Sequence, residues 1–211
     1  MKSVLCFGDS NTFGATAIDA AGQSTRYDRS HRWPYLLAGL LGPEWEVIPE
    51  GLPGRTTAYD DPLEGAIRNG YIGLDIALET HKPLDYVVLM LGTNDLKVRL
   101  SLTPTDIAKG VERLVGLIRS KPVFAGKPAP QIIIVAPVPI LEGRTIRDIL
   151  DGGAAKSRAL APLYAALASR VGATFIDAAQ HAQVDDLDGV HLTPESHVAL
   201  AKAIAAQLVP A

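Results

Sequence analysis

The chain has 211 residues, 47% of them hydrophobic and 20% charged, and this composition is typical of one folded domain that spans residues 1–211. The net charge of −3 argues against nucleic acid or an anionic membrane surface as a partner. The apolar runs are too short to span a bilayer, and the single cysteine excludes an intrachain disulfide.

The first residues of the chain indicate in which cellular compartment the protein is expected. Met1-Lys2-Ser3 runs directly into a first apolar strand pattern, which leaves no room for a cleaved leader, so we expect a cytoplasmic protein. Cys6 lies inside this first strand pattern, where a buried apolar role is expected rather than a reactive thiol.

Strand and helix patterns alternate along the chain, which predicts parallel βαβ units. Strand runs such as residues 132–135 are apolar on both faces, as in a sheet covered by helices on both sides. The pattern therefore predicts an α/β fold, a three-layer α/β/α sandwich with five parallel strands in the flavodoxin-like order 2-1-3-4-5. The predicted strands are Ser3–Phe7, Trp45–Glu50, Tyr86–Leu91, Gln131–Ala136 and Thr174–Asp177, and the predicted helices are Trp33–Leu41, Gly70–His81, Thr105–Arg119, Ala154–Val171 and Pro194–Leu208.

Three predicted strands end in polar loops that contain glycine. Gly8-Asp9-Ser10 follows the first strand, Gly51-Leu52-Pro53-Gly54 the second, and Gly92-Thr93-Asn94 the third. The carboxyl ends of parallel strands share one edge of the sheet, where such folds bind ligands. There the N–H groups of Ser10 and Gly54 and the Asn94 amide can stabilise the oxyanion that develops during acyl transfer.

Near the other end of the chain, Asp188 precedes His191 by three residues across an Asp-Gly turn. A serine hydroxyl is a poor nucleophile unless an imidazole accepts its proton and a carboxylate orients that imidazole. Ser10, His191 and Asp188 can supply these three roles. Asp9 is expected to anchor the nucleophile turn, and Asp95 to be a structural loop carboxylate.

These four motifs, around Ser10, Gly54, Asn94 and His191, occur in the order found in the SGNH, or GDSL-like, hydrolase superfamily, and the chain resembles that superfamily. Its four marker residues map to these positions, and Asp188 maps to the triad acid. Residues 55–57, 60–62 and 91–95 are most similar to the bacterial arylesterase and acyltransferase branch. The resemblance implies a serine esterase that cleaves short-chain aryl or alkyl esters through an acyl-enzyme, with acyl transfer to alcohols, and without metal or cofactor.

One position departs from the usual pattern of this superfamily. Asn11 follows the nucleophile where leucine is commonest, and we expect its side chain to face the substrate pocket or the neighbouring loop. We assign it to substrate binding and expect a partly polar acyl pocket. Lys97 is a further candidate for substrate binding, and Arg55 for the wall of the pocket entrance. The other histidines, His31, His81, His181 and His197, are expected at the surface or at helix ends.

Two long irregular stretches, Ala15–Arg32 and Pro137–Gly153, are expected near the sheet edge that carries Ser10. In the arylesterase branch such excursions form subunit contacts, so the resemblance implies a homo-oligomer. The apolar residues of the second stretch would form an exposed patch on a monomer, as interfaces do. They are Ile140, Leu141, Ile146, Ile149 and Leu150.

Two alternatives from other classes stay open. Ser10–Thr16 is rich in hydroxyls and follows a first strand, as in flavodoxin-like modules that bind FMN phosphate. Asp9, Asp95, Asp188 and His191 can be combined into the ligand set of a metal-dependent hydrolase, although the spacings typical of zinc sites are missing.

Overall fold

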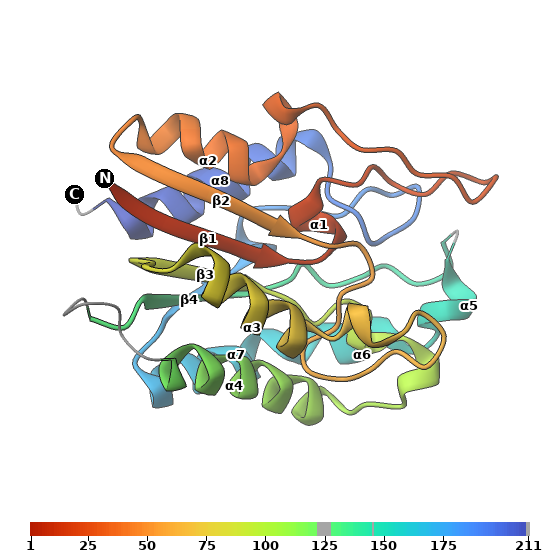
Figure 1. The fold of residues 1–211 in the computed structure, drawn as a ribbon. Coiled ribbons are helices and arrows are strands. Elements are labelled where there is room, and N and C mark those ends of the chain that lie inside the picture. Colours follow the sequence, from red (N-terminus) through yellow and green to blue (C-terminus); the bar gives the residue numbers. More distant parts are fainter. Residues whose placement is uncertain (122–127, 145, 210–211) are drawn as a thin grey trace.

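The computed structural model describes residues 1–121, 128–144 and 146–209. Its centre is a parallel sheet of five strands in the order β2-β1-β3-β4-β5, so the first strand lies in the interior of the sheet (Figure 1). The strands are β1 (Lys2–Gly8), β2 (Trp45–Gly51), β3 (Tyr86–Met90), β4 (Gln131–Ala136) and β5 (Thr174–Asp177).

Helices cover both faces of the sheet, which makes three layers. Helices α2 (Trp33–Leu41) and α8 (Pro194–Leu208) pack on one face. Helices α3 (Gly70–His81), α4 (Pro104–Ser120) and α7 (Leu160–Val171) pack on the other. Three short helices, α1 (Ser10–Phe13), α5 (Arg147–Leu150) and α6 (Gly153–Arg158), lie in the connections.

The alternation of side chains along β1 explains the two apolar layers. Val4 and Cys6 pack with the core under α2 and α8, and Leu5 and Phe7 pack with the core under α3, α4 and α7. All four side chains are fully buried, as expected for a central parallel strand. Burial raises the pKa of the Cys6 thiol far above its usual value, which keeps it protonated and unreactive.

The predicted fold is confirmed, and most element boundaries agree to within one residue. The helix predicted over Ala154–Val171 is wrong in one respect, because the structure divides it at Ala159 into α6 and α7. Pro162 explains the division, since it has no N–H to donate to the residue 158 carbonyl and is tolerated only in the first turn of a new helix.

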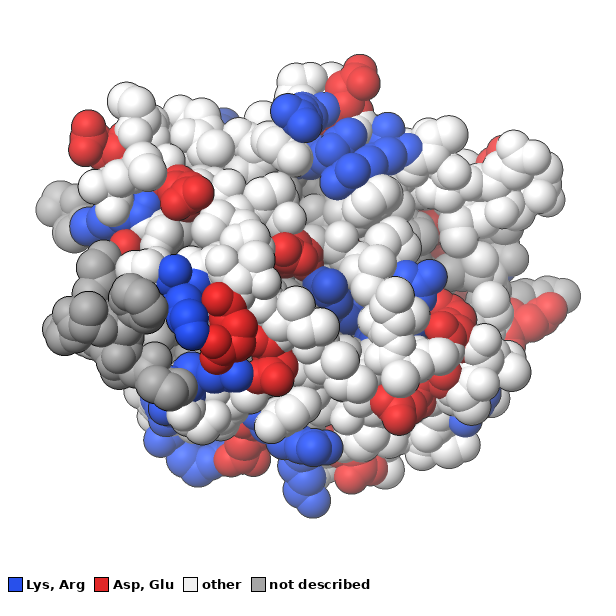
Figure 2. All heavy atoms as spheres, viewed as in Figure 1, with Lys and Arg blue, Asp and Glu red and all other residues white. Residues whose placement is uncertain are grey.

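Charges of both signs are interspersed over the face shown in Figure 2, with large uncharged areas between them. Several bulky apolar side chains are also exposed, among them Leu63 (78%), Ile67 (69%) and Ile76 (63%). Within the described part of the chain, no helix is long and apolar enough to cross a membrane.

Candidate active site

Ser10 lies at the carboxyl end of β1, as the first residue of α1. The Asp9 side chain caps this helix by accepting a hydrogen bond from the Asn11 N–H at 3.0 Å. Gly8 is required immediately before this turn, because a Cβ there would come within 2.1 Å of Thr12 Oγ1 and 2.8 Å of the Met90 carbonyl oxygen. The strand-to-helix junction therefore holds the Ser10 hydroxyl at the sheet edge.

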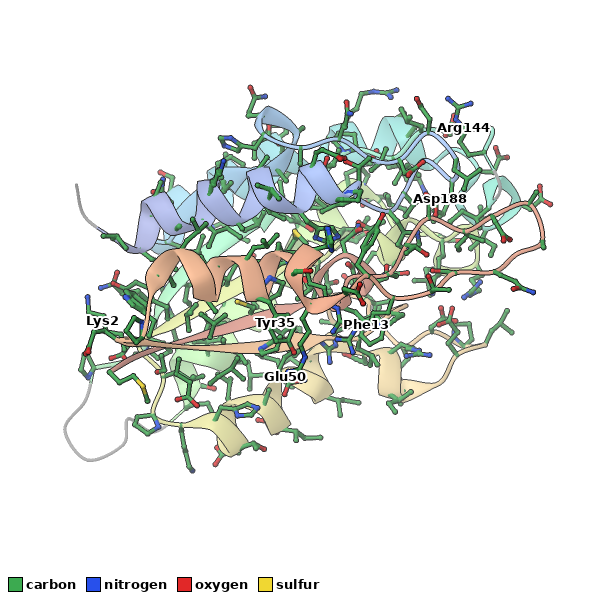
Figure 3. All side chains as sticks on the ribbon, turned by 90° about the horizontal axis from the view of Figure 1, so that it is seen from above. Lys2, Phe13, Tyr35, Glu50, Arg144 and Asp188 are labelled. Atoms are coloured by element: carbon green, nitrogen blue, oxygen red, sulfur yellow. The ribbon has the colours of Figure 1, made fainter. Side chains whose placement is uncertain are left out.

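The loop between β5 and α8 brings His191 and Asp188 to the same edge. His191 Nε2 lies 3.0 Å from Ser10 Oγ, and Nδ1 lies 2.5 Å from Asp188 Oδ2. Seen from above, Asp188 lies at the opposite end of the molecule from Lys2, where β1 begins (Figure 3). A turn at Gly189, with φ of +74°, folds the carboxylate back onto the imidazole.

Asp188 is almost completely buried. Burial alone would raise the pKa of its carboxyl, but the hydrogen bond and charge of His191 outweigh this and hold the pKa below its usual value. Two N–H donors add to the effect, from His191 at 3.0 Å and from Ile18 at 2.8 Å. The carboxylate is thus ionised at neutral pH and suited to orient an imidazole and stabilise its charged form.

The candidate oxyanion donors come from two further loops on this edge. Gly54 follows β2 with φ of +79°, a conformation that favours glycine, and Asn94 follows β3. Within the described part of the chain, the N–H groups of Ser10 and Gly54 donate no hydrogen bond to the protein. The Asn94 amide donates to Asp9 Oδ2 at 3.4 Å, which leaves its second N–H for a ligand.

A buried carboxylate ties the two donor loops together. Asp95, next to Asn94, accepts from the Thr57 N–H at 2.9 and 3.0 Å and from the Thr57 hydroxyl at 2.5 Å. Desolvation raises the pKa of Asp95 to about 7 and that of Asp9 to about 6. Both carboxyl groups serve structure here, in agreement with the roles expected for them.

These groups open into a cavity of about 230 Å³. Its lining combines polar groups, Ser10 and His191 among them, with apolar side chains of the two long irregular stretches. The lining residues are Ser10, Ile18, Pro53, Gly54, Glu64, Arg68, Thr93, Asn94, Lys97, Ile146, Ile149, Leu150, Val190 and His191.

Comparison with known proteins agrees with this geometry. Residues 6–199 match the model of the GDSL-like lipase/acylhydrolase family. The chain belongs to this family. Among curated protein sequences, no match was found.

Several solved structures of esterases are similar to the chain over almost its whole length. They include Est24, a carbohydrate acetylesterase from Sinorhizobium meliloti (39% identity, TM-score 0.93), and the aryl esterase of M. smegmatis (39% identity, TM-score 0.93). A putative arylesterase from Agrobacterium tumefaciens has 40% identity and a TM-score of 0.88. In each case 99% of this chain and 98% of the other are covered. This member of the GDSL-like family is a carboxylic ester hydrolase.

The structure does not support a substrate-binding role for Asn11 in this esterase. The side chain is buried and does not line the cavity. Its amide N–H donates to the Val190 carbonyl at 3.2 Å, and its carbonyl accepts from the Leu192 N–H at 2.9 Å. Asn11 therefore holds the two neighbours of His191, a role that sequence reasoning missed because the partners are about 180 residues away.

Arg55 is also placed differently from the expectation that it lines the entrance. It is buried beneath the sheet edge, stacks on the Phe7 ring at 4.0 Å, and donates to the carbonyl groups of Gly8 (2.8 Å) and Glu50. Desolvation lowers its pKa to about 10. Arg55 thus supports the residues that precede the nucleophile turn.

Lys97 does line the cavity, but its ammonium group is already engaged. It donates to Asp61 at 2.9 Å and to Glu64 at 2.6 Å, and the side chain is nearly buried. Lys97 therefore contributes to the cavity wall through a charge cluster, and direct contact with substrate stays a prediction.

The expectation of a surface or capping role is wrong for His197. This histidine is completely buried, accepts a hydrogen bond from the Trp33 N–H at 3.4 Å and packs edge-on against Tyr27. Desolvation lowers its pKa to about 4. His31 and His181 are exposed, and His81 contacts Glu50 at 2.9 Å from a half-buried position.

The two long irregular stretches lie where they were expected, at the edge that carries Ser10. Ile18 of the first donates its N–H to Asp188, and both stretches supply cavity wall within one chain. The expected apolar patch is only partly present, because Ile140 and Leu150 point into the core. Leu141 and Ile149 remain about four-tenths exposed, at 42% and 43%.

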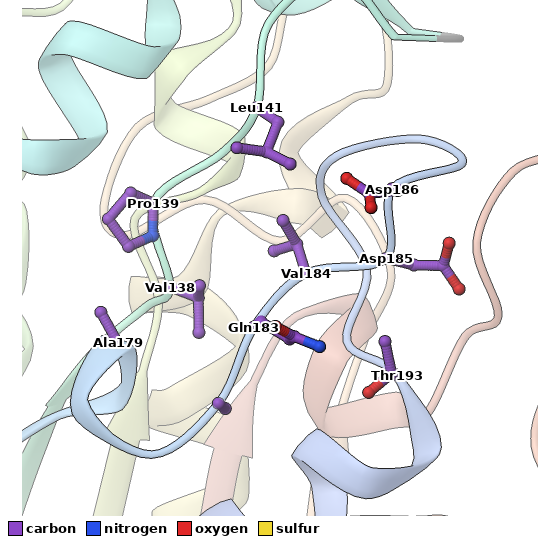
Figure 4. A pocket seen from close by; sticks show the side chains of 10 residues that line it. Val138, Pro139, Leu141, Ala179, Gln183, Val184, Asp185, Asp186 and Thr193 are labelled. Carbon is purple, nitrogen blue, oxygen red and sulfur yellow. The ribbon is translucent and has the colours of Figure 1, made fainter.

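A second hollow, of about 510 Å³, lies beside the loop that carries Asp188 and His191 (Figure 4). It is lined by residues such as Val138, Gln183 and Asp186, and contains none of the candidate catalytic groups. The smaller cavity is therefore the one that fits the chemistry.

Neither alternative from the sequence finds support in the site. In the segment proposed to bind FMN phosphate, the N–H groups of residues 11–16 already donate to protein oxygens, and Thr12 is buried. Among the described residues, no group of three or more His, Cys, Asp or Glu side chains is arranged to hold a metal ion.

Proposed function

We propose that this esterase cleaves short-chain acyl esters through a Ser-His-Asp triad made of Ser10, His191 and Asp188. The observation that carries the proposal is the continuous chain of contacts from Asp188 through both imidazole nitrogens to Ser10 Oγ, at the floor of a cavity. The names of the similar structures, aryl esterase and carbohydrate acetylesterase, support acetyl and other short acyl esters as substrates.

In the proposed reaction, His191 Nε2 accepts the proton of Ser10 Oγ as the oxygen bonds to the ester carbonyl carbon. The carbonyl π electrons move onto oxygen, and the oxyanion accepts hydrogen bonds from the Ser10 and Gly54 N–H groups and the Asn94 amide. When the intermediate collapses, the alkoxide leaves with the proton from His191. Water then repeats the sequence on the acyl-enzyme and releases the acid.

Replacement of the nucleophile tests this proposal directly. We expect Ser10→Ala to lower kcat on 4-nitrophenyl acetate by about 10⁴-fold or more, with an unchanged circular dichroism spectrum. Ser169→Ala, in α7 and away from the site, is the matched control and should behave as wild type. Substantial Ser10→Ala activity would contradict the assignment of the nucleophile.

The size of the cavity supports a preference for short acyl groups. Its volume of about 230 Å³ is below the usual range for sites that enclose drug-sized ligands. We expect kcat/KM to fall along a series of 4-nitrophenyl esters from acetyl to octanoyl. An optimum at octanoyl would be incompatible with this view of the site.

We also propose acyl transfer to alcohols. Ile18, Ile146 and Ile149 form an apolar wall beside Ser10, where an alcohol with an alkyl chain is favoured over water as the acceptor for the acyl-enzyme. Formation of the new ester from 1-butanol in aqueous buffer, measured by gas chromatography, tests this. Hydrolysis without any transfer product would exclude it.

A homo-oligomer is proposed as the working form. Its support is the set of exposed apolar side chains, of which Leu63 and Ile67 are within three positions of Glu64, a cavity-lining residue, in the sequence. The interface expected from the sequence alone lay elsewhere, in the stretches Ala15–Arg32 and Pro137–Gly153. Light scattering at micromolar concentration distinguishes the two states, and the mass of a monomer would refute the proposal.

A further inference from the structure

Five charged side chains form a cluster, and three of them, Glu64, Arg68 and Lys97, line the active-site cavity. The carboxylates are Asp61 and Glu64, and the cations are Arg68, Lys97 and Arg99. The Arg99 guanidinium and Lys97 ammonium hold the pKa of the Asp61 carboxyl well below its usual range. With three cations and two carboxylates, the cluster carries one positive charge in excess.

Within this cluster, Arg68 is the cation with the fewest hydrogen bonds to the carboxylates. Asp61 accepts from Lys97 at 2.9 Å and from Arg99 at 2.7 and 2.9 Å. Glu64 Oε1 accepts from the same two cations at 2.6 and 2.8 Å. Among the described residues, the Arg68 side chain forms an ion pair with Glu64 alone, with Nε 3.3 Å from Oε2, and this Nε is buried without a well-formed hydrogen bond.

Arg68 also lies beside Gly54, one of the candidate oxyanion donors. A Cβ built on Gly54 would lie 2.4 Å from Glu64 Oε2 and 3.3 Å from Arg68 Nε, so this ion pair packs directly against the Gly54 backbone. The Arg68 side chain lines the same cavity as Ser10 and His191 and is 28% exposed, which leaves part of the guanidinium accessible to a ligand.

We propose that Arg68 is a specificity-determining residue that binds a carboxylate on the substrate. This inference rests on the proposed esterase function and names a class of substrate for it, esters that carry a second, ionised carboxyl group. A planar guanidinium with free N–H donors binds carboxylate in a two-pronged geometry, and the substrate charge would neutralise the excess positive charge of the cluster. Neutral esters remain substrates but lack this contact.

The carboxylate can be on the acyl part or on the alcohol part of the ester, and paired substrates distinguish the two. For the acyl part, monoethyl succinate is compared with ethyl succinamate, its uncharged amide, by titration of the released acid. For the alcohol part, 4-carboxyphenyl acetate is compared with 4-carbamoylphenyl acetate. The measured quantity is the ratio of kcat/KM for the acid to kcat/KM for the amide.

We expect this ratio to fall roughly tenfold or more in Arg68→Gln in one of the two pairs, because hydrogen bonds to charged groups are worth that much in affinity. Arg68→Lys retains the charge and should restore part of the ratio. Arg170→Gln, a surface arginine paired with Glu112, is the control and should leave the ratio as in wild type. Added salt should lower the wild-type ratio.

The two proposals fail in different ways. Suppose that, for both substrate pairs, wild type and Arg68→Gln give the same ratio, and that the ester bond of the two amide-bearing substrates is still cleaved only when Ser10 is present. The role of Arg68 is then refuted and the esterase proposal stands. If wild type does not cleave the ester bond of these neutral substrates, or Ser10→Ala cleaves it equally well, the proposed function is refuted as well.

Discussion

Substitution of Asn11 by leucine, the residue commonest at this position in the superfamily, is the sharpest test of the site described above. Asn11→Leu removes two buried hydrogen bonds and leaves the Val190 carbonyl and the Leu192 N–H without partners. Each unsatisfied group costs about 1–3 kcal/mol. Burial of the leucine side chain offsets about 1.5–3 kcal/mol, so we expect the free energy of unfolding to fall by roughly 2 kcal/mol.

The effect of Asn11→Leu on activity follows from the position of His191 between these two anchored residues. A displaced imidazole should lower kcat by up to about 10²-fold for every ester in an acyl series, without a change in the preferred chain length. Asn11→Asp retains the acceptor for the Leu192 N–H but loses the donor and buries a carboxylate, so a loss of stability at least as large is expected.

Urea denaturation together with kcat/KM for acetyl to octanoyl esters checks both expectations for Asn11. A stable, fully active Asn11→Leu enzyme with a preference for longer acyl groups would refute the reasoning. That result would place the side chain in the acyl pocket, as the sequence alone suggested.

Two further predictions concern Asn94 and His197. Asn94→Ala should lower kcat by about 10²–10³-fold with little change in KM, because the amide acts on the oxyanion, and a change in KM alone would instead make it a substrate-binding residue. The pKa of His197 is lowered to about 4 in the folded protein, so its contribution to stability is complete above pH 6.5 and is lost as pH falls toward 4. The free energy of unfolding should therefore fall less between pH 6.5 and pH 4 in His197→Gln than in wild type, by up to about 3 kcal/mol. Equal pH profiles for the two proteins in urea denaturation would contradict this.

The fold was predictable from the sequence because the interior strands β1, β3 and β4 are apolar on both faces and the strand patterns end in turn signals. Runs such as Ile132–Val135 have no solvent-facing alternation, which identifies interior strands. The helix predicted over Ala154–Val171 was wrong at Ala159, because the helical sequence pattern continues through Pro162 although one helix ends there and a second begins.

The candidate site was predictable only where a local motif marks it. Ser10, Asn94 and His191 each belong to a short local motif whose neighbouring residues identify the position. Arg55 and His197 do not, because their environments are created by packing against elements far along the chain. The charge cluster around Arg68 was missed for the same reason, since its members are scattered over residues 61–99 without periodic spacing.

The hydrogen bond between the side chains of His191 and Ser10 joins residues that are 181 positions apart in the sequence. A chain being synthesised therefore cannot bring the proposed nucleophile and its base together until nearly all of it has left the ribosome and the loop before α8 has docked beside the end of β1. Such distant pairing carries a large loop-closure cost and is expected late on the folding pathway. Recovery of ester hydrolysis during refolding should consequently report the last docking step, and lag behind the recovery of helical signal.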